Sequence, residues 1–224
     1  TPGKMNSVYN RILDSEPPLI VQAIADGPDS IHIYFSEPLG DLPGHIEIEG
    51  IEILDISFNS MSLDQIIIRV SPLQPRTVYT IAVHDYADCS SNKTGQENIE
   101  VVLPEQPEPG DLVINEILFN PKEDFHDYLE LLNQSPKYIS LEGLSISNGE
   151  NEKLISMYSI MAPREYRVIS PDPTEILEYY LRSPENSIVE NDLPAFVNTD
   201  GVALLLSQEG EILDSIVYKE DWHF

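Results

Sequence analysis

Short runs of strand-forming residues, separated by turn formers, constrain the fold of this chain more than any other feature. Residues Ser30–Phe35 and Thr77–Val83 alternate apolar with polar or small side chains, as strands with one buried face do. Seven such runs, with turns such as Asp26–Asp29 between them, fill the first part of the chain. They are Leu19–Ala25, Ser30–Phe35, His45–Glu49, Ile51–Phe58, Gln65–Val70, Thr77–Val83 and Asn98–Leu103. The spacing predicts an antiparallel β-sandwich.

The second part repeats this pattern, but its first two runs contain an acidic residue among apolar ones. Val113–Leu118 contains Glu116, and Tyr128–Asn133 contains Glu130. Further strands are expected at Tyr138–Ile146, Glu165–Ser170, Val202–Ser207 and Ile212–Tyr218. One short helix is expected at Pro173–Leu181, because its first turn holds proline and an acid and its apolar residues share one side. The predicted fold class is all-β, with two sandwich domains in tandem and one helix in the second.

A proline-rich segment divides the chain. Residues Pro104–Gly110 include three prolines and a glycine, which cannot continue a sheet ladder and favour a stiff, extended conformation. We therefore expect a first domain at 18–103, a linker at 104–110 and a second domain at 111–224. The length of 224 residues is sufficient for two domains of ordinary size.

The composition excludes some classes of partner. Asp and Glu number 39 against 12 Lys and Arg, for a net charge of -27, so no basic patch is available for nucleic acid. The charge itself is explained by solubility. No apolar run approaches the roughly 18 residues of a membrane span. The single cysteine, Cys89, can form no intramolecular disulfide and is expected to be a small buried apolar residue.

The second part resembles the lamin-tail domain, an immunoglobulin-like β-sandwich found in nuclear lamins and in many bacterial secreted or surface proteins. The resemblance rests on Asn115-Glu116-Ile117 and Leu129-Glu130-Leu131-Leu132-Asn133, and it extends through Leu193–Phe196 and Gly210–Tyr218. It implies a binding or spacing module, which enzymes carry only as an accessory.

The first part resembles the bacterial Ig-like domains of S-layer and adhesin proteins. The matching pieces are Phe35–Leu39, Val78–Ile81 and Asp85–Asn92. Ser91 stands where that family usually has glycine, in the turn before the final strand. The resemblance implies that this domain, too, is an immunoglobulin-like sandwich.

The two ends of the chain suggest a piece of a longer tandem protein. No signal peptide opens the chain, so it is either cytoplasmic or an internal segment. Residues Thr1–Ser7 look like the closing segment of a lamin-tail unit, whereas the chain stops at Trp222–Phe224, before a closing segment of its own. We expect residues 1–17 to be a linker that carries the tail of a preceding unit, and the second domain to be truncated at its C-terminus.

Few constellations in the sequence could carry chemistry. Glu116 and Glu130 could be neighbours across a sheet and act as acid and base, but no nucleophile or water-activating group accompanies them. His126 with Asp124 and Asp127 is the most metal-like cluster, but a solvated loop is the better explanation, because isolated motifs of this kind are weak signals. No histidine makes an HExxH pair or lies at zinc spacing from a cysteine. We therefore expect no catalytic residue, no metal ligand and no enzyme activity.

A calcium ion near Asp85, Asp88 and Asn92 is the one alternative to a chain without cofactors. Their side-chain oxygens could converge in one turn, as calcium requires. The same residues are also typical of a turn that is capped by hydrogen bonds from backbone to side chain. A calcium site needs about six or more oxygens, and few others are evident here.

Three functions fit these observations. The first is a non-catalytic, monomeric module pair of an extracellular or cell-surface protein, for spacing, adhesion or binding of a protein or glycan. The second is an accessory region of a secreted hydrolase or nuclease whose catalytic domain lies outside this chain. The third is an intrinsic calcium-binding or metal-dependent hydrolase. Tyr179, Tyr180 and Trp222 could form a sugar-stacking surface, although helix packing explains Tyr180 and a chain end explains Trp222.

Overall fold

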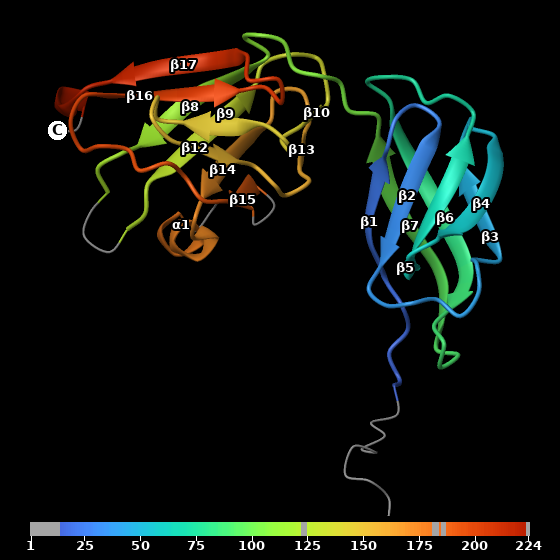
Figure 1. The fold of residues 1–224 in the computed structure, drawn as a ribbon. Helices are drawn as coiled ribbons and strands as arrows, with labels where there is room; N and C mark the ends of the chain where they lie inside the picture. Colours follow the sequence, from blue (N-terminus) through green and yellow to red (C-terminus); the bar gives the residue numbers. More distant parts are fainter. Residues whose placement is uncertain (1–13, 122–124, 181–183, 185–186, 223–224) are drawn as a thin grey trace, which may run out of the picture. The chain divides into compact units, whose positions relative to one another are not determined.

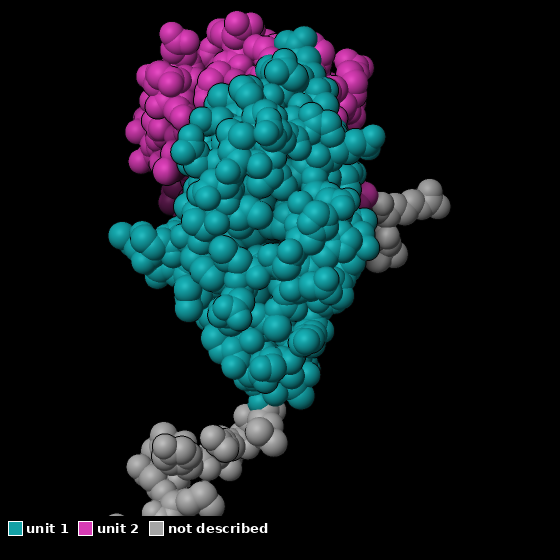
Figure 2. All heavy atoms as spheres, turned by 90° about the vertical axis from the view of Figure 1, so that its right-hand side faces the viewer, with its two compact units in different colours: residues 1–103 teal, residues 104–224 magenta. Residues whose placement is uncertain are grey.

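The computed structural model describes residues 14–121, 125–180, 184 and 187–222, and it contains two compact units, residues 1–103 and 104–224 (Figure 2). Each unit has its own apolar core. Most of the expected linker at 1–17, including Thr1–Ser7, lies outside the described residues. In the described part of the chain, no helix is long and apolar enough to cross a membrane.

Unit 1 is a sandwich of two antiparallel sheets (Figure 1). One sheet has the order β1-β2-β5-β4 and the other β3-β6-β7. This is the strand order of the constant-type immunoglobulin domain, so the expected sandwich is confirmed. Its strands are β1 (Ile20–Ala25), β2 (Ser30–Phe35), β3 (His45–Ile48), β4 (Ile53–Asn59), β5 (Ser62–Val70), β6 (Val78–Ala87) and β7 (Lys93–Val102).

Alternation along the strands builds the core of unit 1. Ile31 and Ile33 of β2 are fully buried, and they meet Ile66 of β5 and Ile81 of β6 in one apolar cluster. A tyrosine corner closes the connection from β5 to β6, because the hydroxyl of Tyr79 accepts a hydrogen bond from the backbone N–H of Gln74 at 2.9 Å. Sequence reasoning did not find this corner.

Unit 2 is a second sandwich with more irregular edges (Figure 1). Its sheets have the orders β12-β11-β16-β17 and β15-β14-β9-β8, with a small β10-β13 pair beside them. Only β14 and β15 run parallel among the described pairs. The elements are β8 (Leu112–Leu118), β9 (Tyr128–Asn133), β10 (Ile139–Ser140), β11 (Ser145–Ser147), β12 (Glu152–Leu154), β13 (Ile160–Met161), β14 (Tyr166–Ser170), α1 (Pro173–Tyr179), β15 (Ile188–Glu190), β16 (Gly201–Leu206), β17 (Ile212–Tyr218) and the short 3-10 helix η2 (Glu220–Trp222).

Three expectations need correction. The run Tyr138–Ile146 is not one strand, because a turn that contains Gly143 at φ 85° sends β10 and β11 into different sheets. The short strands β12, β13 and β15 were missed, because two or three residues show no periodicity. Cys89 is exposed and not buried, since it lies at the tip of the turn between β6 and β7.

A fully buried asparagine joins two turns of unit 2. The Asn133 side-chain amide donates hydrogen bonds to the carbonyls of Lys137 at 2.7 Å and of Met161 and Ala162 at 3.1 Å. Its oxygen accepts from the backbone N–H and the hydroxyl of Ser135. Asn133 therefore ties the turn after β9 to the turn before β14, and the family motif that ends in this residue has an architectural role.

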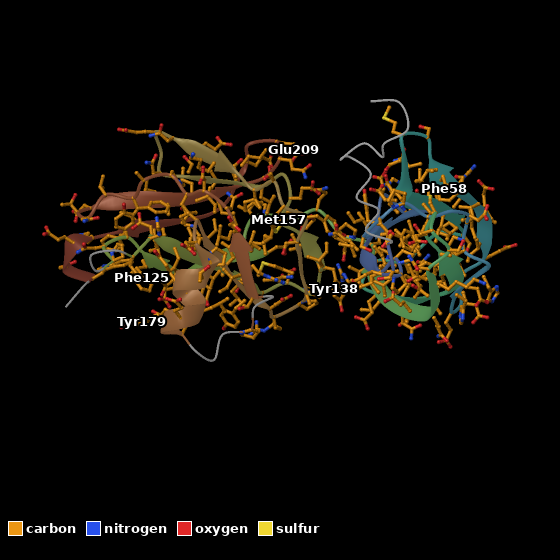
Figure 3. All side chains as sticks on the ribbon, turned by 90° about the horizontal axis from the view of Figure 1, so that it is seen from below. Phe58, Phe125, Tyr138, Met157, Tyr179 and Glu209 are labelled. Carbon is orange, nitrogen blue, oxygen red and sulfur yellow. The ribbon has the colours of Figure 1, made fainter. Side chains whose placement is uncertain are left out.

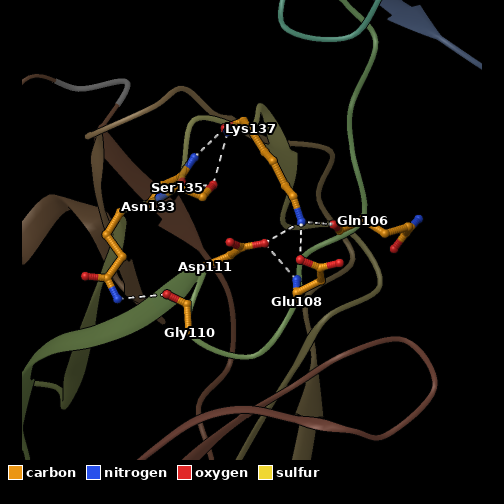
Figure 4. A network of polar contacts seen from close by, with 8 residues as sticks. Gln106, Glu108, Gly110, Asp111, Asn133, Ser135 and Lys137 are labelled. Atoms are coloured by element: carbon orange, nitrogen blue, oxygen red, sulfur yellow. Dashed lines mark hydrogen bonds and ion pairs between the residues drawn. The ribbon is translucent and has the colours of Figure 1, made fainter.

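Lys137 holds the proline-rich segment against unit 2 (Figure 4). Its ammonium group donates to the Asp111 carboxylate at 2.6 Å and to the Gln106 carbonyl at 3.2 Å, and it pairs with Glu108 at 3.2 Å. The Glu105 N–H also donates to the Tyr138 carbonyl. Residues 105–111 are thus hydrogen-bonded along unit 2 and are not a free spacer.

The Asn133 network yields a stability prediction. Asn133→Ala should lower the free energy of unfolding of unit 2 by about 3 kcal/mol, because the buried amide donates to the carbonyls of Lys137, Met161 and Ala162, and all three hydrogen bonds are lost. Asn120→Ala, at an exposed asparagine of the same unit, should change it by less than about 0.5 kcal/mol. Amide hydrogen exchange at increasing urea concentrations measures the free energy of unfolding of unit 2 in both variants. Equal destabilisation by the two substitutions would contradict the architectural role of Asn133.

Candidate functional site

The outer face of the β15-β14-β9-β8 sheet gathers side chains that could bind a ligand. Glu116 of β8 lies directly opposite Glu130 of β9, which confirms the expectation that they are neighbours across a sheet. A β-bulge at Asn115 makes this possible. Because the bulge accommodates two consecutive polar residues, Ile114 and Ile117 on either side of them both remain in the core.

Hydrogen bonds hold the two carboxylates on this face. The Tyr128 hydroxyl donates to Glu116, and the Asn115 amide donates to Glu130 at 2.7 Å. Burial and the neighbouring Glu116 carboxylate raise the pKa of Tyr128, so its hydroxyl stays protonated and acts as a donor. The two carboxylates therefore have fixed positions while Glu116 remains exposed to solvent.

An aromatic cluster of Phe125, Tyr128, Tyr179 and Tyr180 lies at one end of the outer face. Tyr179 and Phe125 lie side by side (Figure 3), in an edge contact with ring centroids 5.3 Å apart. Tyr179 also makes an edge contact with Tyr180, with ring centroids 5.2 Å apart. Tyr180 in turn contacts Tyr128, with their hydroxyls 3.4 Å apart. Tyr179 is 59% exposed and Tyr180 43% exposed, so much of this aromatic surface faces water. Trp222, on η2, does not belong to the cluster.

Helix α1 positions these tyrosines. Its N-cap is Asp172, whose carboxylate accepts from the Thr174 N–H at 2.9 Å, and Pro173 occupies the first turn. Ile176 is buried and anchors the helix to the sandwich. The helix ends at Tyr179, and Leu181, with which it was expected to end, lies outside the described residues.

His126 contacts helix α1, which is distant from it in the sequence. The Glu175 carboxylate accepts the backbone N–H of His126 and lies 2.9 Å from its Nδ1. Ligand atoms of His126, Glu175 and Asp172 all lie within 4.8 Å of one another and could together hold a metal ion. They supply three ligands, one fewer than a structural zinc site has. Asp124 lies outside the described residues.

The carboxylate of Asp127 contacts a backbone N–H group and is not a member of the cluster around His126. Its carboxylate faces the Phe196 N–H at 3.4 Å, and burial raises its pKa above the ordinary value. Among the described residues, His126 shares its cluster of metal-ligating groups with Asp172 and Glu175. Only the fold brings Asp172 and Glu175 to His126, since 49 residues separate His126 from Glu175.

The turn that offered calcium ligands is capped by its own aspartate. Asp88 accepts the backbone N–H groups of Ser90 and Asn92 at 2.8 Å and the Asn92 side-chain amide at 2.7 Å. Burial acts to raise the pKa of Asp88, but the hydrogen bonds from Asn92 and Ser90 outweigh it, so this pKa lies below its ordinary value. Ser91 adopts φ 71°, the conformation for which glycine is common.

Of the two acids expected at this turn, Asp88 alone is in the acidic cluster, together with Asp14 and Glu37, which were not expected. Carboxylate oxygens of Asp14, Glu37 and Asp88 lie within 4.8 Å of one another, and Asp85 is not among them. Burial and then the negative charge of Asp14 raise the pKa of Glu37. Three carboxylates, one of them already capping a turn, fall short of the six or more oxygens of a calcium site.

Fold and site together define an immunoglobulin-like module with an open, aromatic and acidic sheet face. The family model of the lamin tail domain matches residues 105–220, slightly more than half of the chain. The chain therefore belongs to the lamin tail domain family.

Two solved structures of a bacterial S-layer protein, SbsC, are similar to the chain. The N-terminal part of SbsC has 12% identity and a TM-score of 0.37, covering 68% of this chain and 40% of its own length. SbsC domains 1–6 have 9% identity and a TM-score of 0.38, covering 91% and 40%. At such scores the likeness has no bearing on function. No curated protein matches the chain.

The contact between His126 and Glu175 yields a pH prediction. The hydrogen bond that the His126 ring donates to the Glu175 carboxylate raises the pKa of His126 above its ordinary value of 6.5. The contact between His126 and Glu175 therefore contributes its full stabilisation of the folded state below pH 6.5. This contribution is lost as the pH rises through the folded-state pKa of His126. Glu175→Gln should lower the pKa of His126, measured by NMR titration, and should lower the melting temperature more at pH 5.5 than at pH 8.5. Glu178→Gln on the same helix should leave the pKa unchanged; an equal shift in both variants would contradict the contact.

Proposed function

We propose that this chain is a non-catalytic pair of immunoglobulin-like modules that serves spacing, adhesion or partner binding in a secreted or cell-surface bacterial protein. Membership of the lamin tail domain family and the immunoglobulin strand order of unit 1 support a module of this kind. The resemblance of Phe35–Leu39 and Asp85–Asn92 to bacterial surface-protein domains supports the location. We further propose domains at 18–103 and 111–224 joined by residues 104–110, a monomeric state, and no affinity for nucleic acid.

The main support for this proposal is the position of the two carboxylates, Glu116 and Glu130, that were the candidates for acid–base chemistry. Glu116 and Glu130 lie on a sheet face that is open to water, and the groups that touch them are a tyrosine hydroxyl and an amide. A reaction centre needs several convergent groups and protection from water. Other ionisable groups serve the architecture, as the network of Lys137 with Asp111 and Glu108 illustrates.

Labelling of native cells tests the location. Antibodies raised against residues 14–222 should label intact cells, and external protease should remove the label, because a surface module is accessible from outside. A cytoplasmic marker protein serves as the control for cell integrity. Label that appears only after permeabilisation would contradict the proposal.

Turnover assays test the absence of catalysis. The purified chain should hydrolyse neither nucleic acids nor chromogenic esters and glycosides, with or without divalent cations. The proposal would be overturned by turnover that is lost in Glu116→Gln or Glu130→Gln. Glu152→Gln, on the opposite sheet, is the control and would retain that turnover. A hydrolase domain elsewhere in the same open reading frame would instead favour the accessory role.

A further inference from the structure

We infer that the outer face of the β15-β14-β9-β8 sheet binds a basic segment of a partner protein, with a lysine or arginine side chain seated between Glu116 and Glu130. This inference rests on the proposed function as a binding module and names its surface and the chemistry of its partner. Three features of the face support it: an uncompensated carboxylate pair, exposed aromatic rings and flanking apolar side chains.

The carboxylate pair favours the binding of a cation. Glu116 and Glu130 are direct cross-strand partners, and like charges in such positions destabilise a sheet. Within the described residues, neither carboxylate forms an ion pair with lysine, arginine or histidine. Their hydrogen bonds from Tyr128 and Asn115 fix them in place without neutralising them. A guanidinium or ammonium group that donates to both would remove the repulsion, and a guanidinium matches carboxylate geometry especially well.

The aromatic cluster favours the same partner. Tyr180 lies beside the pair, because its hydroxyl is 3.4 Å from that of Tyr128, which itself donates to Glu116. Tyr179 and Tyr180 are both exposed to solvent. A cation above a tyrosine ring is attracted by the π-electrons. A chain that enters between Tyr180 and Glu116 would therefore meet both kinds of attraction at once.

Apolar side chains continue the face on the other side of the pair. Register places Val113, Leu132 and Tyr166 in one row across three strands, and Val168 lies next to Glu130 in the row of the carboxylates. Residues directly opposite one another share a face, so these side chains all point outward. Tyr166 is 48% exposed. The surface therefore fits a segment in which a basic residue is flanked by aliphatic ones, and the net charge of -27 would attract it from solution.

Titration with defined peptides tests the inference. The probe is a 12-residue peptide with two arginines among leucines and serines, and its control replaces both arginines with citrulline, which keeps the shape and removes the charge. In NMR spectra of the isotope-labelled chain, the arginine peptide should shift the amide signals of residues 113, 116, 130, 132, 166 and 168. The citrulline peptide should shift them much less.

Matched variants separate this face from the general acidity of the chain. The double variant Glu116→Gln/Glu130→Gln should weaken binding of the arginine peptide by about tenfold or more, and Tyr180→Ala by a smaller factor. Glu152→Gln, at an exposed glutamate on the opposite sheet, should change it by less than about twofold. Far-ultraviolet circular dichroism confirms that each variant is folded.

Each other outcome overturns the inference. Equal weakening by Glu152→Gln, or shifts scattered over both units, would show attraction to net charge alone. A neutral oligosaccharide that shifts this face when the arginine peptide does not would assign the surface to glycans. If the native chain does not bind the arginine peptide but is found at the cell surface, only this inference is refuted. If the chain binds the peptide but is found inside the cell, only the proposed function is refuted.

Discussion

The side-chain amide of Asn133 is the contact on which the architecture of unit 2 most depends. A fully buried amide is tolerated only when its donors and acceptor are satisfied, and here they join turns that lie 28 and 29 residues away in sequence. The N–H and carbonyl of Asn133 also bond to the loop before β14. This single residue thus fixes how the strand that carries Glu130 meets the next strand of its sheet.

Several acidic side chains of this protein accept hydrogen bonds from backbone N–H groups and so serve the architecture. Asp88 caps the turn between β6 and β7, and Asp172 caps helix α1. Asp214 of β17 accepts the Ile114 N–H of β8 at 2.7 Å and so joins the edges of two sheets. A carboxylate that accepts backbone N–H groups stabilises the fold while it stays charged. The large excess of acids therefore does not by itself indicate a site.

The outer face of unit 2 differs from these architectural acids. The bulge at Asn115 turns Glu116 outward, where it meets Glu130, and helix α1 brings Tyr179 and Tyr180 beside them. Each of these residues is positioned by buried neighbours, such as Ile117 and Ile176. A rigid scaffold that presents an exposed, charged and aromatic surface is the arrangement expected of a recognition module.

The sequence by itself determined the all-β class, the strands with clear alternation such as Ser30–Phe35, and the helix at Pro173, because each leaves a periodic or local signal. Only the tertiary structure decided that Cys89 is exposed, that Tyr138–Ile146 divides between two sheets, and that His126 contacts Glu175. Those outcomes depend on contacts between residues far apart in the chain, and no pattern within one segment encodes them.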